Sequence, residues 1–496
     1  MRKFFLGGNG LEGIYPGKAA MNKKRSDTAP LLWFGLVLSI TLAIAFLLTV
    51  TPQDFWWYLR IGHDTLTAGA VPTVDALTFT QAGMPVVYHS WAAAVVFWLT
   101  FKAGGLTLVV FLRGLLLALT FSLLWLTARR FGAGRLGAAL VLLMAVMASS
   151  NNWSVRPQLF AYPLFALALY LLYRWHKGDS RAAWGLPLIS LLWVNLHGSF
   201  VLLVLLAGTA LLFGRGDRRS MALAAAGVLL ATLVNPRGFG SWTYVYNSLH
   251  AASSQLFSSE WGPPLNSGWQ MNIFFLWLLG FPLLAALTPR KPDRLEWSWF
   301  LGFGFMALWG ERYVIWFIFI LAVLTALMLA DWEKKTLGDP KPGSPLLNVG
   351  LSVAFVLLPL SLLPGVRSAW WRSAPPVTEH TPIAATEWLA AHPDLPGPLW
   401  SEIGFSSYLE FAMPERPTWI DTRFEVFPEE QWQQYKDITL ASYNWESQLD
   451  ATGAKILMLS TQYPDLLAAL SVSPAWCEVY HDQVAVIFLH APCGGH

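Results

Sequence analysis

Charged side chains are scarce over most of this chain, and their absence excludes a water-soluble globular protein for residues 30–364. Asp, Glu, Lys and Arg make up only 13% of the sequence, whereas hydrophobic residues make up 55%. Eleven long apolar stretches fill this region, and nearly all ionisable side chains lie in the short gaps between them. Runs of about 20 apolar residues match the hydrocarbon thickness of a bilayer. The sequence therefore predicts an integral membrane protein.

Other signals are also missing. Apolar runs such as 31–50 show no period-2 alternation, which excludes barrel strands and predicts transmembrane helices. No glycine-rich nucleotide-binding loop is present, and no inverted repeat points to a secondary transporter. We expect no cleavable signal peptide, because residues 1–28 are polar and the first span lacks a clear small-residue cleavage site. Met21 is an alternative start of the chain.

Lys and Arg collect in alternate gaps, as is typical of cytoplasmic loops. Residues 1–30 and the gaps around 129–135, 174–181, 215–219, 290–294 and 334–341 hold 21 basic residues, and the intervening gaps hold five. The spans that satisfy this alternation are 31–50, 106–127, 135–150, 157–173, 183–197, 199–214, 220–235, 271–288, 295–310, 313–330 and 346–364. The apolar run 89–101 is short, and as a span it would invert every later loop. We therefore predict an interfacial or re-entrant helix there, on the outer side.

This topology divides the chain into three parts. Residues 1–30 form a cytoplasmic tail, and residues 31–365 form a membrane module whose first outer loop is 51–105. Residues 366–496 have the composition of a soluble α/β domain, which the parity of the spans places outside the membrane. Strand-like runs occur at 398–403, 418–426, 454–460 and 483–490, and helical patterns at 384–392, 428–436 and 464–470. The pattern at 477–493 predicts a strand, a turn and a second strand.

The only two cysteines, Cys477 and Cys493, both lie in this last part. An even pair outside the membrane could form a disulfide, but the sequence alone leaves the pairing open.

The polar residues that hydropathy does not explain lie on the outer side. Asp54 directly follows the first span, at the start of a Trp-rich amphipathic helix. It suits a helix N-cap beside an aromatic belt, and it equally suits a general base held at membrane depth; the two interpretations are compatible.

Arginine near a bilayer surface, with no topological reason to be there, suits a phosphate partner, because its planar fork binds phosphate oxygens. Arg156 and Arg312 are the best such candidates, Arg113 is a weaker third, and His197 lies at the same level. Taken singly, His197 is more typical of a helix cap. Further candidates at the outer ends of spans are Asp75, His89, Gln158, Asn195 and Glu260.

Several short motifs resemble those of a broad group of prokaryotic multi-pass membrane proteins. They are Asp-x-Trp-Trp at 54–57, Gly-x-x-Pro at 69–72, His-x-Trp at 89–91, Arg-Pro-Gln at 156–158, Asn-Leu-His-Gly at 195–198, Asn-Pro-x-Gly at 235–238, Ser-Glu-Trp at 259–261, and the run 404–423. The match covers about 51–489 and includes the closing Val-Ala-Val-Ile-Phe at 484–488. The architecture of this group is similar to that of the GT-C glycosyltransferases, which include the protein O-mannosyltransferases and the lipid A aminoarabinose transferase.

The resemblance implies an inverting transfer of a sugar from a polyprenyl-phosphate carrier to a glycan, lipid or protein of the cell envelope. It places the acidic hallmark of the first outer loop at Asp54, with Arg156, Arg312 and His197 on the donor phosphate. It implies a multi-pass protein of the plasma membrane, with no nucleic-acid partner. The alternative is a non-catalytic assembly or lipid-glycan carrier protein on the same scaffold.

Two positions depart from the motifs of the group, which usually have His at 58 and Glu at 90, whereas this chain has Tyr58 and Ser90. A glutamate at 90 would be a second carboxylate or a ligand for a divalent metal. Asp75 or Glu260 could substitute for it, and the sequence leaves the choice and the metal open.

Overall fold

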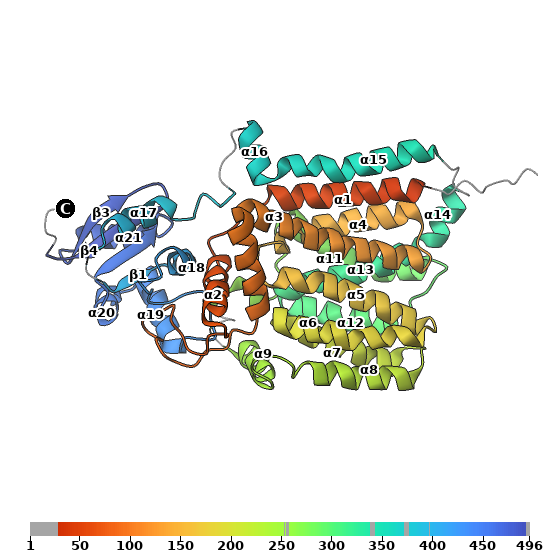
Figure 1. Cartoon of the computed structure of the whole chain (residues 1–496), viewed down its shortest axis with the longest axis horizontal. Coiled ribbons are helices and arrows are strands. Elements are labelled where there is room, and N and C mark those ends of the chain that lie inside the picture. The colour runs from red at the N-terminus through yellow and green to blue at the C-terminus, as the bar shows by residue number, and fades with distance from the viewer. Residues whose placement is uncertain are drawn as a thin grey trace, which may run out of the picture.

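The computed structural model describes residues 28–251, 253, 257–337, 343–371, 376–395 and 397–492. Most of the predicted cytoplasmic tail, the alternative start at Met21, Lys341 and the predicted pairing partner Cys493 lie outside these residues. The structure is an elongated helical bundle with an α/β domain at one end (Figure 1).

Each of the eleven predicted spans contains a helix. These helices are α1 (Ala29–Leu47), the second part of α3 (Trp91–Arg130), α4 (Arg135–Ser149), α5 (Gln158–His176), α6 (Leu186–Leu196), α7 (Val201–Phe213), α8 (Arg218–Ala231), α11 (Gly268–Leu287), α12 (Arg294–Trp309), α13 (Val314–Met328) and α15 (Pro345–Leu357). In the described part of the chain, five helical segments are long and apolar enough to cross a membrane, by length and composition alone. The protein is therefore a membrane protein, and the number of crossings remains a prediction.

The bundle is built around α13, in which every residue from Val314 to Met328 is buried. Helices on its periphery instead expose large apolar side chains, such as Leu276 (73%) and Leu279 (74%) on α11 and Leu346 (85%) on α15. Continuous apolar surface of this kind is not stable in water and suits contact with lipid. The buried α13 fixes the loop that precedes it on the central axis of the bundle.

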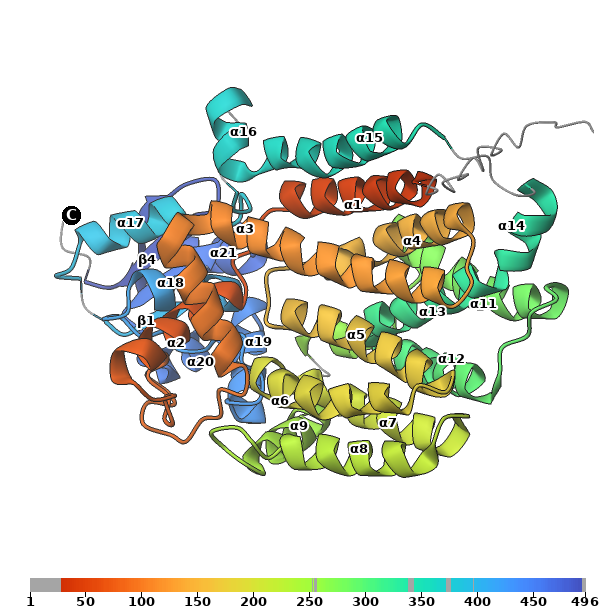
Figure 2. The ribbon, with the colours of Figure 1, turned by 45° about the vertical axis from the view of Figure 1, so that its right-hand side comes forward.

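Two helices lie across the end of the bundle that faces the α/β domain: α2 (Phe55–Ala68) and the first part of α3 (Figures 1 and 2). Helix α3 bends at Gly104 and Gly105, and Gly105 has φ +58°, a left-handed conformation that favours glycine. The short helix predicted over 89–101 is therefore present and distinct from the span that follows. Gly62 lets α2 approach α3, since a Cβ there would lie 2.2 Å from the Ala94 carbonyl oxygen.

The loops between the helices gather at two opposite ends, as the alternation of charge predicts. At the end away from the α/β domain, His176 Nε2 lies 2.7 Å from Asp293 Oδ2, and Glu333 of α14 (Ala330–Leu337) accepts hydrogen bonds from the backbone of Leu136 and Gly137. The remaining loops lie at the end that faces the α/β domain. Two short helices, α9 (Gly240–His250) and α16 (Pro364–Trp371), lie at this end too (Figure 1).

The C-terminal domain contains a four-stranded sheet in the order β1-β2-β4-β3, with β1 parallel to β2 and the other pairs antiparallel. Its strands are β1 (Leu399–Ser401), β2 (Ile456–Ser460), β3 (Trp476–His481) and β4 (Ala485–His490). Its helices are α17 (Ile383–Ala391), α18 (Ile403–Ala412), α19 (Glu429–Thr439), α20 (Trp445–Ala451) and α21 (Pro464–Val472). The hairpin predicted within 477–493 is present as β3 and β4.

The strand predicted at 418–426 is wrong. Only Thr418 makes isolated bridges there, to Thr78 and to Leu399, and the rest of the segment is irregular. Asp421 explains the difference, because its side chain accepts the backbone N–H of Arg423 at 2.7 Å and also pairs with the Arg423 guanidinium. A local side chain–backbone bond of this kind competes with strand pairing.

This Arg423 network joins the first outer loop to the C-terminal domain. Arg423 Nη1 lies 2.6 Å from Asp75 Oδ1 and donates to the Tyr88 hydroxyl at 2.9 Å, and its Nη2 lies 2.5 Å from Asp421 Oδ2. Burial alone would raise the pKa of Asp75, but the adjacent guanidinium and the hydrogen bonds from Thr78 outweigh it and lower that pKa. Asp75 is therefore part of a structural joint and not a pocket residue.

We predict that Arg423→Ala destabilises the junction by about 3–5 kcal/mol, because it leaves two buried carboxylates without a counter-charge. Denaturant unfolding of the purified protein in detergent, followed by tryptophan fluorescence, measures this loss. The matched control is Lys436→Ala, which removes an exposed cation from α19 and should change stability little. Equal stability of the two variants would contradict the assigned role of Arg423.

Candidate functional site

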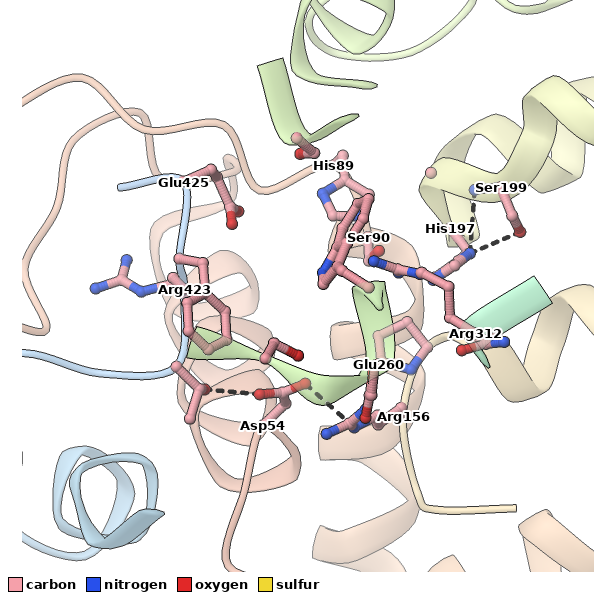
Figure 3. Close-up of a pocket in the computed structure, with 18 of the residues that line it drawn as sticks. Asp54, His89, Ser90, Arg156, His197, Ser199, Glu260, Arg312, Arg423 and Glu425 are labelled. Atoms are coloured by element: carbon pink, nitrogen blue, oxygen red, sulfur yellow. Dashed lines mark hydrogen bonds and ion pairs between the residues drawn. The ribbon is translucent and has the colours of Figure 1, made fainter. Parts of the chain in front are cut away.

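A pocket of about 660 Å³ lies where the bundle, the first outer loop and the C-terminal domain meet (Figure 3). Four residues predicted from the sequence, Asp54, Arg156, His197 and Arg312, all line it, although they lie on separate parts of the chain. His89, Gln158 and Glu260 line it too. These groups therefore line one pocket, as the sequence predicted, and their roles stay a prediction.

Asp54 occupies the N-cap position of α2, yet its side chain makes no capping hydrogen bond. Its Oδ1 instead accepts a hydrogen bond from the Thr422 hydroxyl at 2.6 Å, and its Oδ2 lies 3.2 Å from Arg156 Nε. Thr422 is itself fixed, because Trp57 Nε1 donates to its oxygen at 3.2 Å. The carboxylate is thus held in one orientation at the pocket wall.

Arg156, just before α5, is surrounded by acceptors. Its Nη1 donates to Glu260 Oε1 at 2.5 Å and its Nη2 to Gln53 Oε1 at 2.7 Å, in addition to the ion pair with Asp54. Burial opposes the charge on Arg156, but the two carboxylates outweigh it and raise its pKa. All three guanidinium nitrogens face protein oxygens, so the expectation that Arg156 binds a phosphate is not supported by this arrangement.

Arg312 lies in the short turn that leads into the buried α13, and its guanidinium carbon sits 4.0 Å above the centre of the Trp261 ring. Its side chain makes no hydrogen bond or ion pair with any residue that the structure describes. A guanidinium stacked on an aromatic ring keeps its in-plane N–H donors free for another partner. Of the two predicted arginines, Arg312 is therefore the one available to a ligand.

His197, at the end of α6, presents one nitrogen to the pocket. Its Nδ1 accepts the backbone N–H of Ser199 at 3.1 Å and lies 2.7 Å from the Ser199 hydroxyl, which in turn accepts from Trp193 Nε1. Because Nδ1 is an acceptor, the neutral ring carries its proton on Nε2. His197 thus offers a neutral hydrogen-bond donor on the same side of the pocket as Arg312 (Figure 3).

His89 stacks on Tyr244, with ring centres 3.9 Å apart, and meets His197 edge-on at 6.2 Å. Burial, reinforced by the charge of Arg312, lowers the pKa of His89 to about 3. The ring is therefore neutral at physiological pH and forms part of the aromatic wall of the pocket.

The C-terminal domain contributes two carboxyl groups that the sequence did not reveal, Glu402 and Glu425. Glu402 caps α18 by accepting the backbone N–H of Gly404 at 3.0 Å, and burial raises its pKa to about 7. Burial also raises the pKa of Glu425, which lies across the pocket from Arg312 (Figure 3). Both residues lie far in sequence from the other pocket residues and in a domain with ordinary charge content, so no sequence signal distinguished either one.

The two positions that depart from the group motifs adjoin each other in this pocket. Ser90 is buried beside the Tyr58 phenol, and burial together with Asp54 and Glu425 raises the pKa of Tyr58 above its usual value. Tyr58 and Ser90 therefore form a neutral pair where the group has a histidine and a glutamate.

Two predicted candidates lie elsewhere. Asn195 accepts from Trp91 Nε1 at 2.9 Å and donates to the Leu191 and Val234 carbonyls, so it connects three helices. Arg113 is buried and donates to the carbonyls of Ala45, Leu48 and Thr49, which cap the end of α1. Both side chains serve packing, because these contacts lie within the bundle and neither residue lines the pocket.

The sequence left open whether the site holds a divalent metal. Among the described residues, no group of three or more His, Cys, Asp or Glu side chains is arranged to hold a metal ion. Two carboxylates of the pocket, Asp54 and Glu260, both contact Arg156.

Comparison with solved structures identifies the fold. The chain is similar to the archaeal oligosaccharyltransferase AglB from Archaeoglobus fulgidus, solved with an inhibitory peptide and a dolichol-phosphate (TM-score 0.56, 11% identity, 92% of this chain and 74% of that one). The same enzyme solved with Zn and sulfate gives a TM-score of 0.52 at 13% identity, over 92% and 73% of the two chains.

ArnT from Cupriavidus metallidurans, bound to undecaprenyl phosphate, is similar at a TM-score of 0.48 and 13% identity, over 94% of this chain and 99% of that one. No family model matches the sequence, and no curated protein matches it either. The chain therefore shares its overall fold with the archaeal oligosaccharyltransferase.

We predict that Glu402→Gln stabilises the protein at pH 8 and has a much smaller effect at pH 5. The folded-state pKa of about 7 lies above the ordinary 4.5, so the stability that the neutral carboxyl contributes is lost as the pH rises through 7. Glutamine stays neutral and still accepts the Gly404 N–H, so the gain at pH 8 should be about 1–3 kcal/mol. Thermal unfolding at both pH values measures it, with exposed Glu430→Gln as control. Equal destabilisation at both pH values would contradict the prediction.

Proposed function

We propose that this protein, which has the GT-C fold, transfers a sugar from a polyprenyl-phosphate donor to an acceptor of the cell envelope. The observation that carries the proposal is the pocket itself. It combines an oriented carboxylate at Asp54 with an unpaired guanidinium at Arg312 and a neutral donor at His197. These are the groups that an inverting transfer from a phosphate leaving group requires.

The donor phosphate fits beside Arg312 and His197. A charge-assisted bond from the free guanidinium and an N–H from His197 Nε2 would both reach the phosphate oxygens and stabilise the charge that develops as it leaves. From there the pocket continues along apolar side chains of α7 and α12, Leu202, Leu205 and Met306. An apolar path of this kind suits a polyprenyl chain.

Asp54 would act as the general base. Its carboxylate takes the proton of an acceptor hydroxyl, the acceptor oxygen forms a bond to the anomeric carbon of the sugar, and the bond between that carbon and the phosphate oxygen breaks. The electron pair of the broken bond stays on the polyprenyl phosphate, so the reaction balances without a further reactant. A phosphate that already bears negative charge and faces Arg312 needs no protonation by an acid.

The acceptor would enter from the side of the C-terminal domain. Glu402, Glu425 and Thr422 line that side and offer hydrogen-bonding groups for sugar or protein hydroxyls. This arrangement would place the C-terminal domain and the pocket on the extracytoplasmic face of the plasma membrane, with the basic loops inside.

Cysteine labelling tests this orientation. In a chain with Cys477 and Cys493 replaced by serine, we expect Tyr443→Cys, at a fully exposed position, to react with a membrane-impermeant maleimide in intact cells. Arg219→Cys and Lys334→Cys, in the basic loops, should react only after the membrane is permeabilised. Labelling of either basic-loop position in intact cells would reverse the proposed orientation.

Mass spectrometry of envelope glycans and lipid-linked sugars, in cells that lack the protein and express variants of it, tests the reaction. Asp54→Asn keeps the shape of the side chain but removes the base, and should lower transfer at least ~100-fold. It should leave binding of a polyprenyl phosphate to the purified protein nearly unchanged.

Arg312→Ala should instead weaken polyprenyl-phosphate binding by about 1.5–3 kcal/mol. The matched control, Lys102→Ala, removes an exposed cation near the same end of the bundle and should behave as wild type. Full transfer by Asp54→Asn would overturn the catalytic role and leave the carrier or assembly function.

A further inference from the structure

Three oxygen-bearing side chains from two distant segments converge on one guanidinium. Asp54 and Gln53 come from the first outer loop and Glu260 from the turn Ser259–Trp261, and they contact Arg156 Nε, Nη2 and Nη1 respectively. Two carboxylates and an amide oxygen are the ligands that hard divalent cations prefer in proteins. Here the centre of that oxygen set holds a side-chain cation.

We propose that Arg156 takes the place of a divalent cation between Asp54 and Glu260, and that its removal would turn these oxygens into a cation site. One part of this inference rests on the function proposed above: if the protein transfers a sugar, that transfer does not need a divalent metal.

Electrostatics supports the substitution. A guanidinium brings one positive charge between two negative ones: it donates hydrogen bonds to Glu260 and Gln53 and forms an ion pair with Asp54. A divalent ion entering the same oxygens would lie against this fixed charge and be repelled by it. Burial opposes ionisation of both partners, but the opposite charges outweigh it: Asp54 and Glu260 raise the pKa of Arg156, and the arginines lower the pKa of Glu260.

The consequence for the reaction is a permanently oriented base. Thr422 donates to one oxygen of Asp54 and Arg156 Nε faces the other, so the plane of the carboxylate is set from two sides. A metal ion would exchange with solution and leave the base unsupported when it departs, whereas a side chain does not. Arg156 is therefore a positioning residue that acts through Asp54.

Mn²⁺ is titrated into the purified full-length protein in detergent, and bound Mn²⁺ is measured by electron paramagnetic resonance. This experiment measures metal binding and does not require sugar transfer. We expect wild type and Arg156→Lys to show no site-specific Mn²⁺, because each keeps a cation at the centre. Arg156→Ala should bind one Mn²⁺ per chain at least ten-fold more tightly than wild type does. The double variant Arg156→Ala/Glu260→Gln should lose that gain, since one of the two carboxylates is gone.

Two results would overturn the proposal. One is a site in the wild-type protein that binds Mn²⁺ and is lost in Asp54→Asn. The other is a folded Arg156→Ala variant that binds Mn²⁺ no better than wild type does. The wild-type titration decides the question even if Arg156→Ala fails to fold.

The second measurement is sugar transfer in isolated membranes, with and without EDTA. Wild-type transfer should stay within two-fold when EDTA is added, and Arg156→Ala should fall about 100-fold because Asp54 loses its orientation. Loss of wild-type transfer on chelation, with recovery on adding Mn²⁺ or Mg²⁺, would overturn the inference. Absence of transfer in every sample would instead count against the proposed function, because the Mn²⁺ titration stands independently of it.

Discussion

The pocket depends on the buried Arg423 network, which fixes the C-terminal domain to the first outer loop. Three ionised side chains are removed from water there, and such burial is tolerated only when each charge is matched at close range. Asp75 and Asp421 meet that condition through the two ends of one guanidinium. Thr422 lies between Asp421 and Arg423 in the chain, so the same contacts set its hydroxyl against Asp54. The position of the proposed base is therefore determined by the joint between domains.

The two sides of the pocket differ in the groups that they leave for a ligand, and this difference gives the proposed reaction a direction. Arg312, at the end of a bundle helix, has no ion-pair partner among the described residues. On the side of the C-terminal domain Arg423 is paired with Asp75 and Asp421, and Glu402 and Glu425 face the pocket. Burial raises the pKa of both glutamates, which favours the neutral form of each carboxyl and lessens its repulsion of an anionic donor. The side next to the membrane thus suits a lipid phosphate, and the opposite side suits neutral hydroxyl groups.

Hydropathy and charge alternation predicted the helices and the convergence of Asp54, Arg156, His197 and Arg312, because both patterns report which end of a span a residue occupies. The strand expected at 418–426 was wrong because propensity does not register the ion network that Arg423 makes with a loop some 350 residues earlier. For the same reason the sequence could not show that Glu260 and Asp54 engage Arg156 and leave Arg312 free. Glu402 and Glu425 were missed since only the folded domain brings them to the pocket.

The departures at Tyr58 and Ser90 acquire a structural explanation from these contacts. The sequence left Asp75 and Glu260 as equal replacements for the carboxylate that the group carries at position 90. The structure separates them, since Asp75 is buried in the Arg423 network whereas Glu260 faces Asp54 across Arg156. A second carboxylate is thus retained beside the proposed base, supplied by another loop and paired with a guanidinium. A neutral Tyr58–Ser90 pair follows naturally, because a further charge at position 90 would lie close to a site whose charges are already balanced by arginine.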